Sequence, residues 1–209
     1  MSIRNHNVKA LGIILAPGES KSIPKKNIHP CAGNPLLYYT AMPAQKVKMA
    51  KLLDRVIIST DNPEIANAAK TYSVEAPFIL PKELATDGIN DLQVIEHALR
   101  ELKNKNGYEP DIIVLLSPAF PLRATSDITK AIELILNNPD AHSTRSIHGY
   151  VDAVRSSTII KLHSLTGNNS MPLQVEKWRQ LSIDSMKELS EAETIIKDRR
   201  AKGKEPWQD

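Results

Sequence analysis

Three polar segments of the chain combine residue types that bind phosphate or carboxylate groups. The first, residues 15–27, reads LAPGESKSIPKKN and contains one glycine, two serines and three lysines. Backbone N–H groups in a glycine-containing turn, together with lysine ammonium groups, suit a polyphosphate. The segment lacks the GxxxxGK[ST] pattern of a P-loop. Two interpretations therefore stay open, a phosphate-binding loop and a solvated basic loop.

Each of the other two segments holds one charged residue with a structural alternative. Residues 59–61 read STD and are followed by Asn62 and Pro63, so Asp61 is predicted to cap a helix rather than to bind a ligand. Residues 115–123 read LLSPAFPLR and place two prolines before Arg123. Prolines define the path of a loop, and an arginine there can pair with a phosphate, a carboxylate or a structural aspartate.

Candidate metal ligands and nucleophiles are few. Asp184, in LSIDSM, can cap the last helix or contribute to a Mg²⁺ site, which usually draws on one or two carboxylates plus substrate phosphates. The six histidines show no HExxH spacing, which argues against a zinc site. Cys31 is the single cysteine, so neither an intrachain disulfide nor a CxxC motif can exist. We predict a buried, inert thiol for Cys31 rather than a nucleophile.

Strands and helices alternate around these segments. Short apolar runs predict strands buried on both faces, and apolar residues at three- and four-residue spacing predict helices between them. The predicted strands are 8–15, 55–60 and 111–116, and the predicted helices are 36–49, 63–72, 89–104 and 126–137. This alternation predicts a doubly wound α/β fold, a mostly parallel sheet flanked by helices in three layers. Ligands of such sheets bind beyond the carboxyl ends of the strands, where all three polar segments lie.

The pattern weakens after Tyr150. Residues 156–162 are compatible with a strand and residues 164–170 form a polar turn, so 147–181 is predicted to be an irregular excursion. An amphipathic helix is expected over 186–200, followed by a frayed tail. With 209 residues, we expect a single domain over 1–209.

Composition excludes several classes of protein. The 27 basic and 24 acidic side chains leave a net charge of +3, and 4% of the residues are aromatic, which argues against nucleic-acid binding. No stretch approaches twenty apolar residues, so no membrane span is expected. The single cysteine is typical of a reducing compartment, and we predict a cytoplasmic location.

Five segments, taken in order, resemble the acylneuraminate cytidylyltransferases, the enzymes that make CMP-activated sialic acids and related nonulosonic acids. CMP-Kdo synthetases are more distant kin. The segments are 15–40, 54–70, 81–87, 114–135 and 182–195. The resemblance implies a Rossmann-like fold of the nucleotide-diphospho-sugar transferase type. It also implies that a sugar acid's hydroxyl attacks the α-phosphorus of CTP with Mg²⁺ assistance and releases pyrophosphate, in surface polysaccharide (lipopolysaccharide or capsule) biosynthesis.

The resemblance also implies roles for individual residues. Lys21 and Arg123 would be catalytic, and Asp184 would be a metal ligand. The implied nucleotide site consists of Ala16, Gly18, Ser20, Lys21, Asn27, Asp91 and Ser117. The implied partners are CTP and a sugar acid. The resemblance also implies a homodimer, whose contacts would be weakened by the shortened segment 147–181.

Several positions depart from the family pattern. Pro17 and Glu19 stand where the family has arginine and glycine, and Leu80 stands where it has arginine. Ser117 replaces a glutamine, and Ser182 replaces the first aspartate of an Asp-Ile-Asp motif. These departures leave two alternatives, a paralogue that binds a nucleotide, sugar or protein partner without turnover, and a transferase for another nucleotide or sugar.

Overall fold

The computed structural model describes residues 8–20, 22–86 and 90–209. Its central feature is a six-stranded sheet in the order β4-β1-β5-β7-β6-β8. The strands are β1 (Ala10–Leu15), β4 (Arg55–Ser59), β5 (Ile112–Leu116), β6 (Ser143–Arg145), β7 (Asp152–Arg155) and β8 (Ser170–Pro172). Strand β7 is antiparallel to β5 and β6, and the other three pairings are parallel. The predicted α/β fold with a mostly parallel sheet is confirmed.

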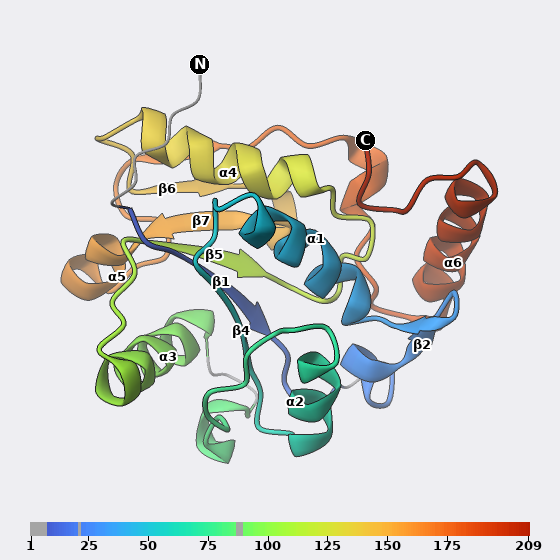
Figure 1. Cartoon of the computed structure of the whole chain (residues 1–209), viewed down its shortest axis with the longest axis horizontal. Coiled ribbons are helices and arrows are strands. Elements are labelled where there is room, and N and C mark those ends of the chain that lie inside the picture. The colour runs from blue at the N-terminus through green and yellow to red at the C-terminus, as the bar shows by residue number, and fades with distance from the viewer. Residues whose placement is uncertain (1–7, 21, 87–89) are drawn as a thin grey trace.

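Helices cover both faces of this sheet (Figure 1). The α-helices are α1 (Tyr38–Met49), α2 (Pro63–Lys70), α3 (Asp91–Asn106), α4 (Thr125–Asn137), α5 (Ser156–Leu162) and α6 (Met186–Ala201). The 3-10 helices are η1 (Lys26–Ile28), η2 (Lys82–Leu84), η3 (Ile147–Gly149) and η4 (Lys177–Gln180), and β2 (Pro30–Cys31) pairs with β3 (Asn34–Pro35). Helices α1 and α4 lie on one face, whereas α3 and α5 lie on the other. No helix in the described part of the chain is long and apolar enough to cross a membrane.

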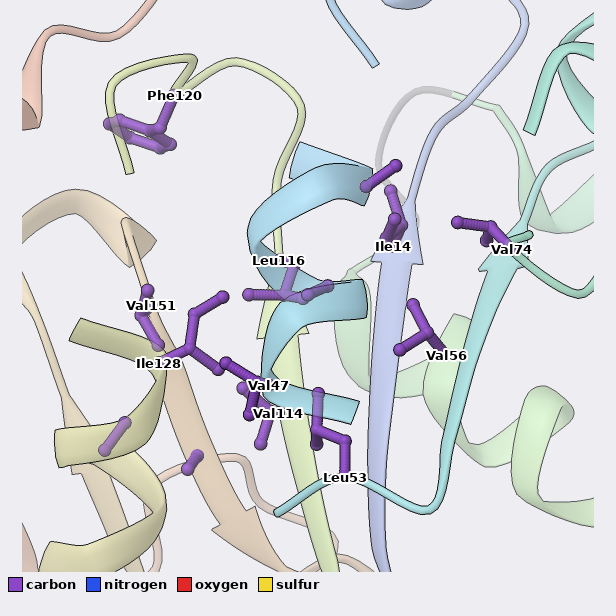
Figure 2. Close-up of a cluster of buried hydrophobic side chains, with 14 of the residues drawn as sticks. Ile14, Val47, Leu53, Val56, Val74, Val114, Leu116, Phe120, Ile128 and Val151 are labelled. Carbon is purple, nitrogen blue, oxygen red and sulfur yellow. The ribbon is translucent and has the colours of Figure 1, made fainter. Parts of the chain in front are cut away.

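The strands of the parallel part are buried on both faces because alternate side chains point to opposite sides of a sheet. Ile14, Val56 and Val114 belong to the cluster that packs against α1 and α4 (Figure 2). Ile13 and Ile113 belong to the cluster on the α3 side. This burial explains why the apolar runs predicted these strands correctly. Burial of apolar surface is also the main stabilising contribution to such a core.

A third cluster joins α6 to β2 and to the start of α1. Ile183, Leu189, Ala192 and Ile196 pack there with Cys31, whose thiol is fully buried. Burial and, to a smaller extent, the nearby Glu193 carboxylate raise the pKa of Cys31 to about 12. The prediction of a buried thiol is thereby confirmed, and such a thiol is a poor nucleophile.

Two predictions for the C-terminal third are wrong. Residues 156–162 form helix α5 rather than a strand, because Ile159 packs against the α3 side of the sheet. The tail is not frayed, since Trp207 is 3% exposed and its carbonyl accepts a hydrogen bond from the Thr125 N–H at 3.0 Å. The buried guanidinium of Arg179 also donates to the carbonyls of Pro206 and Gln208. These contacts join residues distant in sequence, so local patterns do not reveal them.

Candidate active site

The segment after β1, residues 16–27 (loop one), is held in place by polar contacts. The Ala16 N–H donates to the Ser59 carbonyl at 3.0 Å, and the Gly18 N–H donates to Asp61 Oδ1 at 2.7 Å. The Asn27 amide donates to the Pro17 carbonyl at 2.8 Å. A Cβ at Gly18 would lie 2.9 Å from the Cβ of Asn62, so this close approach requires glycine.

Asp61 is therefore not the helix cap that the sequence predicts. The cap of α2 is Asn62, whose side chain accepts hydrogen bonds from the N–H groups of Glu64 and Ile65. Asp61 instead binds the Gly18 amide of loop one. This difference of one residue matters because the Gly18 N–H, which donates to Asp61, is no longer available to bind a phosphate.

Two adjoining pockets flank loop one. The β5–β7 pocket, of about 630 Å³, lies between loop one, the residues after β5 and the turn joining β6 to β7. The β4–α3 pocket, of about 1220 Å³, lies between loop one, the end of β4, η2 and the start of α3. Their shared lining residues are Leu15, Pro17, Glu19, Ser20 and Asp91. Two ligands occupying these pockets would meet at that shared wall.

Most of the predicted nucleotide-site residues line these pockets. Ser20, Asn27, Asp91 and Ser117 line the β5–β7 pocket. The β4–α3 pocket is lined by Ala16, Gly18, Ser20 and Asp91. Lys21 lies outside the described residues. Leu80, one of the departures from the family pattern, contributes an apolar side chain to the β4–α3 pocket.

Arg123 lies elsewhere, completely buried and lining neither pocket. Its guanidinium donates to the Ser117 carbonyl at 2.8 Å, to the Tyr150 carbonyl at 2.9 Å and to Thr40 Oγ1 at 3.0 Å. Burial lowers the pKa of Arg123 to about 10, so the group stays charged at neutral pH. All three partners are neutral oxygen atoms of the protein. In the described residues Arg123 therefore makes no direct contact with an aspartate, and it is not placed to pair with a phosphate or carboxylate ligand in either pocket. Arg123 joins the loop after β5 to the loop before β7.

Asp184 lines neither pocket. It lies next to the β5–β7 pocket, because it is paired with Lys26, which lines that pocket. The Lys26 ammonium donates to the Ile183 carbonyl at 3.1 Å and to Asp184 Oδ1 at 3.4 Å. The Ser182 hydroxyl donates to Asp184 Oδ2 at 2.8 Å. The cap of α6 is Ser185, so Asp184 is not the cap either.

This arrangement does not fit a resident divalent cation. Only one carboxylate is present in residues 182–184, and its oxygens are engaged by an ammonium group and a hydroxyl group. Among the described residues, no group of three or more His, Cys, Asp or Glu side chains is arranged to hold a metal ion. Position 182 is a serine, so this segment offers a cation a single carboxylate, the lower limit for a Mg²⁺ site that also uses substrate phosphates.

The turn joining β6 to β7 supplies pocket residues that sequence analysis missed. Arg145 Nε donates to Asp152 Oδ2 at 2.9 Å, and both residues line the β5–β7 pocket together with His148. His148 and Gly149 both adopt left-handed backbone conformations, with φ of 58° and 70°. Strands β6 and β7 are only three and four residues long. Strands this short leave no clear alternation of apolar and polar residues, so no sequence pattern marks these residues. The available signal is the placement of opposite charges on either side of a short glycine-containing segment.

Asp91 is, with Glu19, one of two acidic residues common to both pockets. Partial loss of hydration raises the pKa of Asp91, and the Asp152 carboxylate raises it further, whereas Arg145 acts in the opposite direction. A carboxyl group with a raised pKa beside a ligand pocket is a stronger base than an ordinary aspartate and is better suited to accept a proton.

Comparison with known proteins identifies the family. A family model described as cytidylyltransferase matches residues 11–171, which include β1, loop one, the segment after β5 and the turn before β7. The chain belongs to the cytidylyltransferase family. The matched range thus contains every described residue that lines the two pockets, and the resemblance drawn from the sequence is confirmed.

Curated relatives of this chain are named for their action on pseudaminic and legionaminic acids. The pseudaminic acid cytidylyltransferase of Campylobacter jejuni is 33% identical over 131 residues, covering 63% of this chain and 55% of that protein. The CMP-N,N'-diacetyllegionaminic acid synthase of Legionella pneumophila is 28% identical over 127 residues, covering 61% and 53%. The chain therefore spans about half the length of these relatives.

Solved structures confirm the fold. The structure of CMP:2-keto-3-deoxy-manno-octonic acid synthetase complexed with CTP has a TM-score of 0.72 at 12% identity, covering 91% of this chain and 99% of that one. A cytidylyltransferase from Leptospira borgpetersenii has a TM-score of 0.64 at 19% identity, covering 97% and 98%.

Proposed function

We propose that this cytidylyltransferase transfers CMP from CTP to a hydroxyl group of a sugar acid and releases pyrophosphate. The observation that carries the proposal is the pair of pockets with one shared wall in loop one. A transfer between two substrates requires that both be held side by side with their reacting atoms in contact. The names of the relatives supply the substrate class, a sialic or related nonulosonic acid.

In this proposal CTP occupies the β4–α3 pocket and the acceptor occupies the β5–β7 pocket. Lys21 and Ser20 of loop one bind the triphosphate, with backbone N–H groups of the loop other than the Gly18 amide, which Asp61 engages. Mg²⁺ arrives bound to the phosphates of CTP, as part of the substrate, because the 182–184 segment does not fit a resident cation. The larger volume of the β4–α3 pocket suits the larger ligand.

The chemistry is an in-line displacement at the α-phosphorus. The acceptor oxygen forms a bond to the α-phosphorus, and the bond from that phosphorus to the oxygen bridging the α- and β-phosphates breaks, so pyrophosphate leaves. The hydroxyl proton passes to the Asp91 carboxylate, which lines both pockets and whose pKa is raised by burial. Arg123 is not catalytic in this scheme; it is a positioning residue that holds Ser117 and Tyr150.

The proposed setting is the cytoplasm, where CTP is available, with the product used for surface polysaccharide assembly. A buried single cysteine is compatible with a reducing compartment. A homodimer remains a prediction, which light scattering of the purified protein would test.

Pyrophosphate release tests the proposed reaction. Wild-type protein would be incubated with MgCTP and, separately, with N-acetylneuraminic, pseudaminic, N,N'-diacetyllegionaminic and 2-keto-3-deoxy-manno-octonic acids. We expect release with at least one acid, none without acid, and loss of release in Lys21→Ala. The matched control is Lys130→Ala, because Lys130 is exposed on α4, away from both pockets.

Thermal unfolding with MgCTP separates binding from turnover. Ligand at a hundred times its dissociation constant adds about 2.7 kcal/mol, which raises the unfolding midpoint of a domain of this size by about 5 to 10 °C. We expect this shift in wild type and not in Lys21→Ala. A shift without pyrophosphate release from any acid would contradict the transferase and favour the paralogue that binds without turnover. Absence of both would refute the nucleotide site itself.

A further inference from the structure

The turn from β6 to β7 forms one wall of the β5–β7 pocket. Arg145 ends β6 and Asp152 begins β7, and the antiparallel register places these two residues opposite each other. Arg145 Nε donates to Asp152 Oδ2 at 2.9 Å. Asp152 is 5% exposed and also accepts a hydrogen bond from the Ser146 N–H at 3.0 Å. The inner part of the Arg145 guanidinium is therefore anchored to the sheet.

Arg145 lines the β5–β7 pocket, and the outer part of its guanidinium is free of protein contacts in the described residues. Neither terminal nitrogen of Arg145 makes a hydrogen bond to any residue that the structure describes, and the side chain keeps 42% of its surface exposed. Guanidinium is planar and presents paired N–H groups in a geometry that matches a carboxylate. Anchoring one nitrogen fixes the orientation of the others, so less conformational freedom is lost when a ligand binds.

In the part of the chain that the structure describes, the lysine and the other arginine nearest this pocket are already engaged. Lys26 binds Ile183 and Asp184, and Arg123 is buried beneath the loops. The carboxylates of Glu19 and Asp91 also line the pocket, and they would repel a ligand carboxylate that lay close to them. Among the described residues, Arg145 is the one guanidinium that lines this pocket. An acidic ligand would therefore be oriented with its carboxylate toward Arg145.

We propose that Arg145, oriented by Asp152, binds the carboxylate of the acceptor and selects an acid over a neutral sugar. The inference rests on the proposed function, in which the acceptor occupies the β5–β7 pocket. Arg145 is the residue that contacts the substrate, and Asp152 is a positioning residue that acts through Arg145. The carboxylate held there leaves the acceptor hydroxyl free to face the shared wall at loop one.

The test uses the acid that gives the fastest pyrophosphate release with wild type, together with its methyl ester as a neutral counterpart. We expect wild type to prefer the acid, with a KM for the ester about 10- to 100-fold higher, as for the loss of one charge-assisted contact. In Arg145→Gln the KM for the acid should rise by a similar factor, while the KM for CTP stays within about twofold. The preference for acid over ester should then disappear. Asp152→Asn should raise the KM for the acid by a smaller factor.

Two further variants keep the result interpretable. Arg100→Gln removes an exposed arginine on α3 that lines neither pocket, and its kinetics should match wild type. Arg145→Lys retains the charge without the planar pair of donors, and it should fall between wild type and Arg145→Gln. A full preference for acid over ester in folded Arg145→Gln or Arg145→Lys would refute the proposal while leaving the transferase intact. Absence of turnover with every acid in wild type would instead refute the proposed function, and this inference with it.

Discussion

The two sides of the central sheet are held together by different interactions. In β1, β4 and β5 the buried residues are almost all aliphatic, with Ile13, Ile57 and Val114 fully buried. On the β7-β6-β8 side the buried set is rich in polar and charged groups. It includes Ser143, Thr144, Asp152, Ser156 and Thr158, and the adjoining loops and helices add Arg123, Asp127, Ser146 and Arg179.

This difference matters for the site because the β5–β7 pocket lies where the two sides meet. The aliphatic side stabilises the sheet without directional contacts, since apolar burial depends on area rather than on orientation. The polar side fixes particular loops at particular distances, because a buried polar group must be hydrogen bonded. We therefore expect changes on the aliphatic side to alter stability alone, and changes on the polar side to alter stability and ligand binding together.

The largest effect should come from Arg123. Arg123→Met leaves the carbonyls of Ser117 and Tyr150 without their donor, and we expect the free energy of unfolding to fall by about 3 to 5 kcal/mol. Ile13→Ala should cost a comparable 2 to 5 kcal/mol, roughly, by leaving a cavity. Urea denaturation measures both. Both variants are then compared at a temperature where they remain folded, and MgCTP affinity and turnover should decrease in Arg123→Met only.

Arg123→Lys covers the case in which Arg123→Met does not fold. It keeps a positive charge, but one ammonium cannot reproduce the planar set of contacts to Ser117, Tyr150 and Thr40. Equal losses of ligand affinity in Arg123→Lys and Ile13→Ala would remove the distinction between the two sides of the sheet.

A smaller loss is expected for Arg179. This buried guanidinium donates to the carbonyls of Leu122, Pro206 and Gln208 at 2.9 to 3.1 Å, so it joins the loop before α4 to the tail. Arg179→Met should lower stability by about 2 to 3 kcal/mol. Hydrogen exchange should become faster at the Thr125 amide, which donates to the Trp207 carbonyl. The amides of β1 should change only by as much as the fall in global stability requires. An unchanged Thr125 amide would show that Trp207 packs without help from Arg179.

Asp61 and Asn62 offer a comparison at about 1 kcal/mol. Asn62→Ala removes the cap of α2 and should cost about 1 kcal/mol. Asn62 lines the β4–α3 pocket but does not hold loop one by a hydrogen bond, so this variant should reduce the MgCTP-induced rise of the unfolding midpoint less than Asp61→Ala does. Asp61→Ala removes the acceptor of the Gly18 N–H and should reduce that rise, because loop one loses a fixed contact. If the two substitutions reduce the MgCTP effect equally, Asp61 has no special role in loop one.

These residues also show how far the sequence could predict the molecule. Apolar runs located β1, β4 and β5, and the five ordered segments identified the family, because both depend on local pattern. Asp61 and Asn62 are adjacent and both suitable as caps, so only the three-dimensional path of loop one separates their roles. Arg123, Arg145 and Trp207 contact residues that are distant in the chain or across a short hairpin. Their roles depend on register and topology, which spacing along the sequence does not encode.

The smallest expected effect is a shift of pH dependence at Asp91. If Asp91 accepts the acceptor proton, kcat at saturating acceptor should rise as pH increases through the Asp91 pKa. The Asp152 carboxylate raises that pKa and the Arg145 guanidinium lowers it. Asp152→Asn should therefore move the acidic limb of the kcat profile to lower pH, and Arg145→Gln should move it to higher pH.

Opposite displacements are informative because a general loss of structure would not produce them. Among the residues that the structure describes, the other titratable groups lining the pocket are Glu19, Lys26 and His148. His148→Gln and Glu19→Gln report whether either residue causes the acidic limb. We expect the limb to persist in both variants. Loss of the limb in His148→Gln would assign the proton to the imidazole, and shifts of the same sign in Asp152→Asn and Arg145→Gln would exclude Asp91 as the proton acceptor.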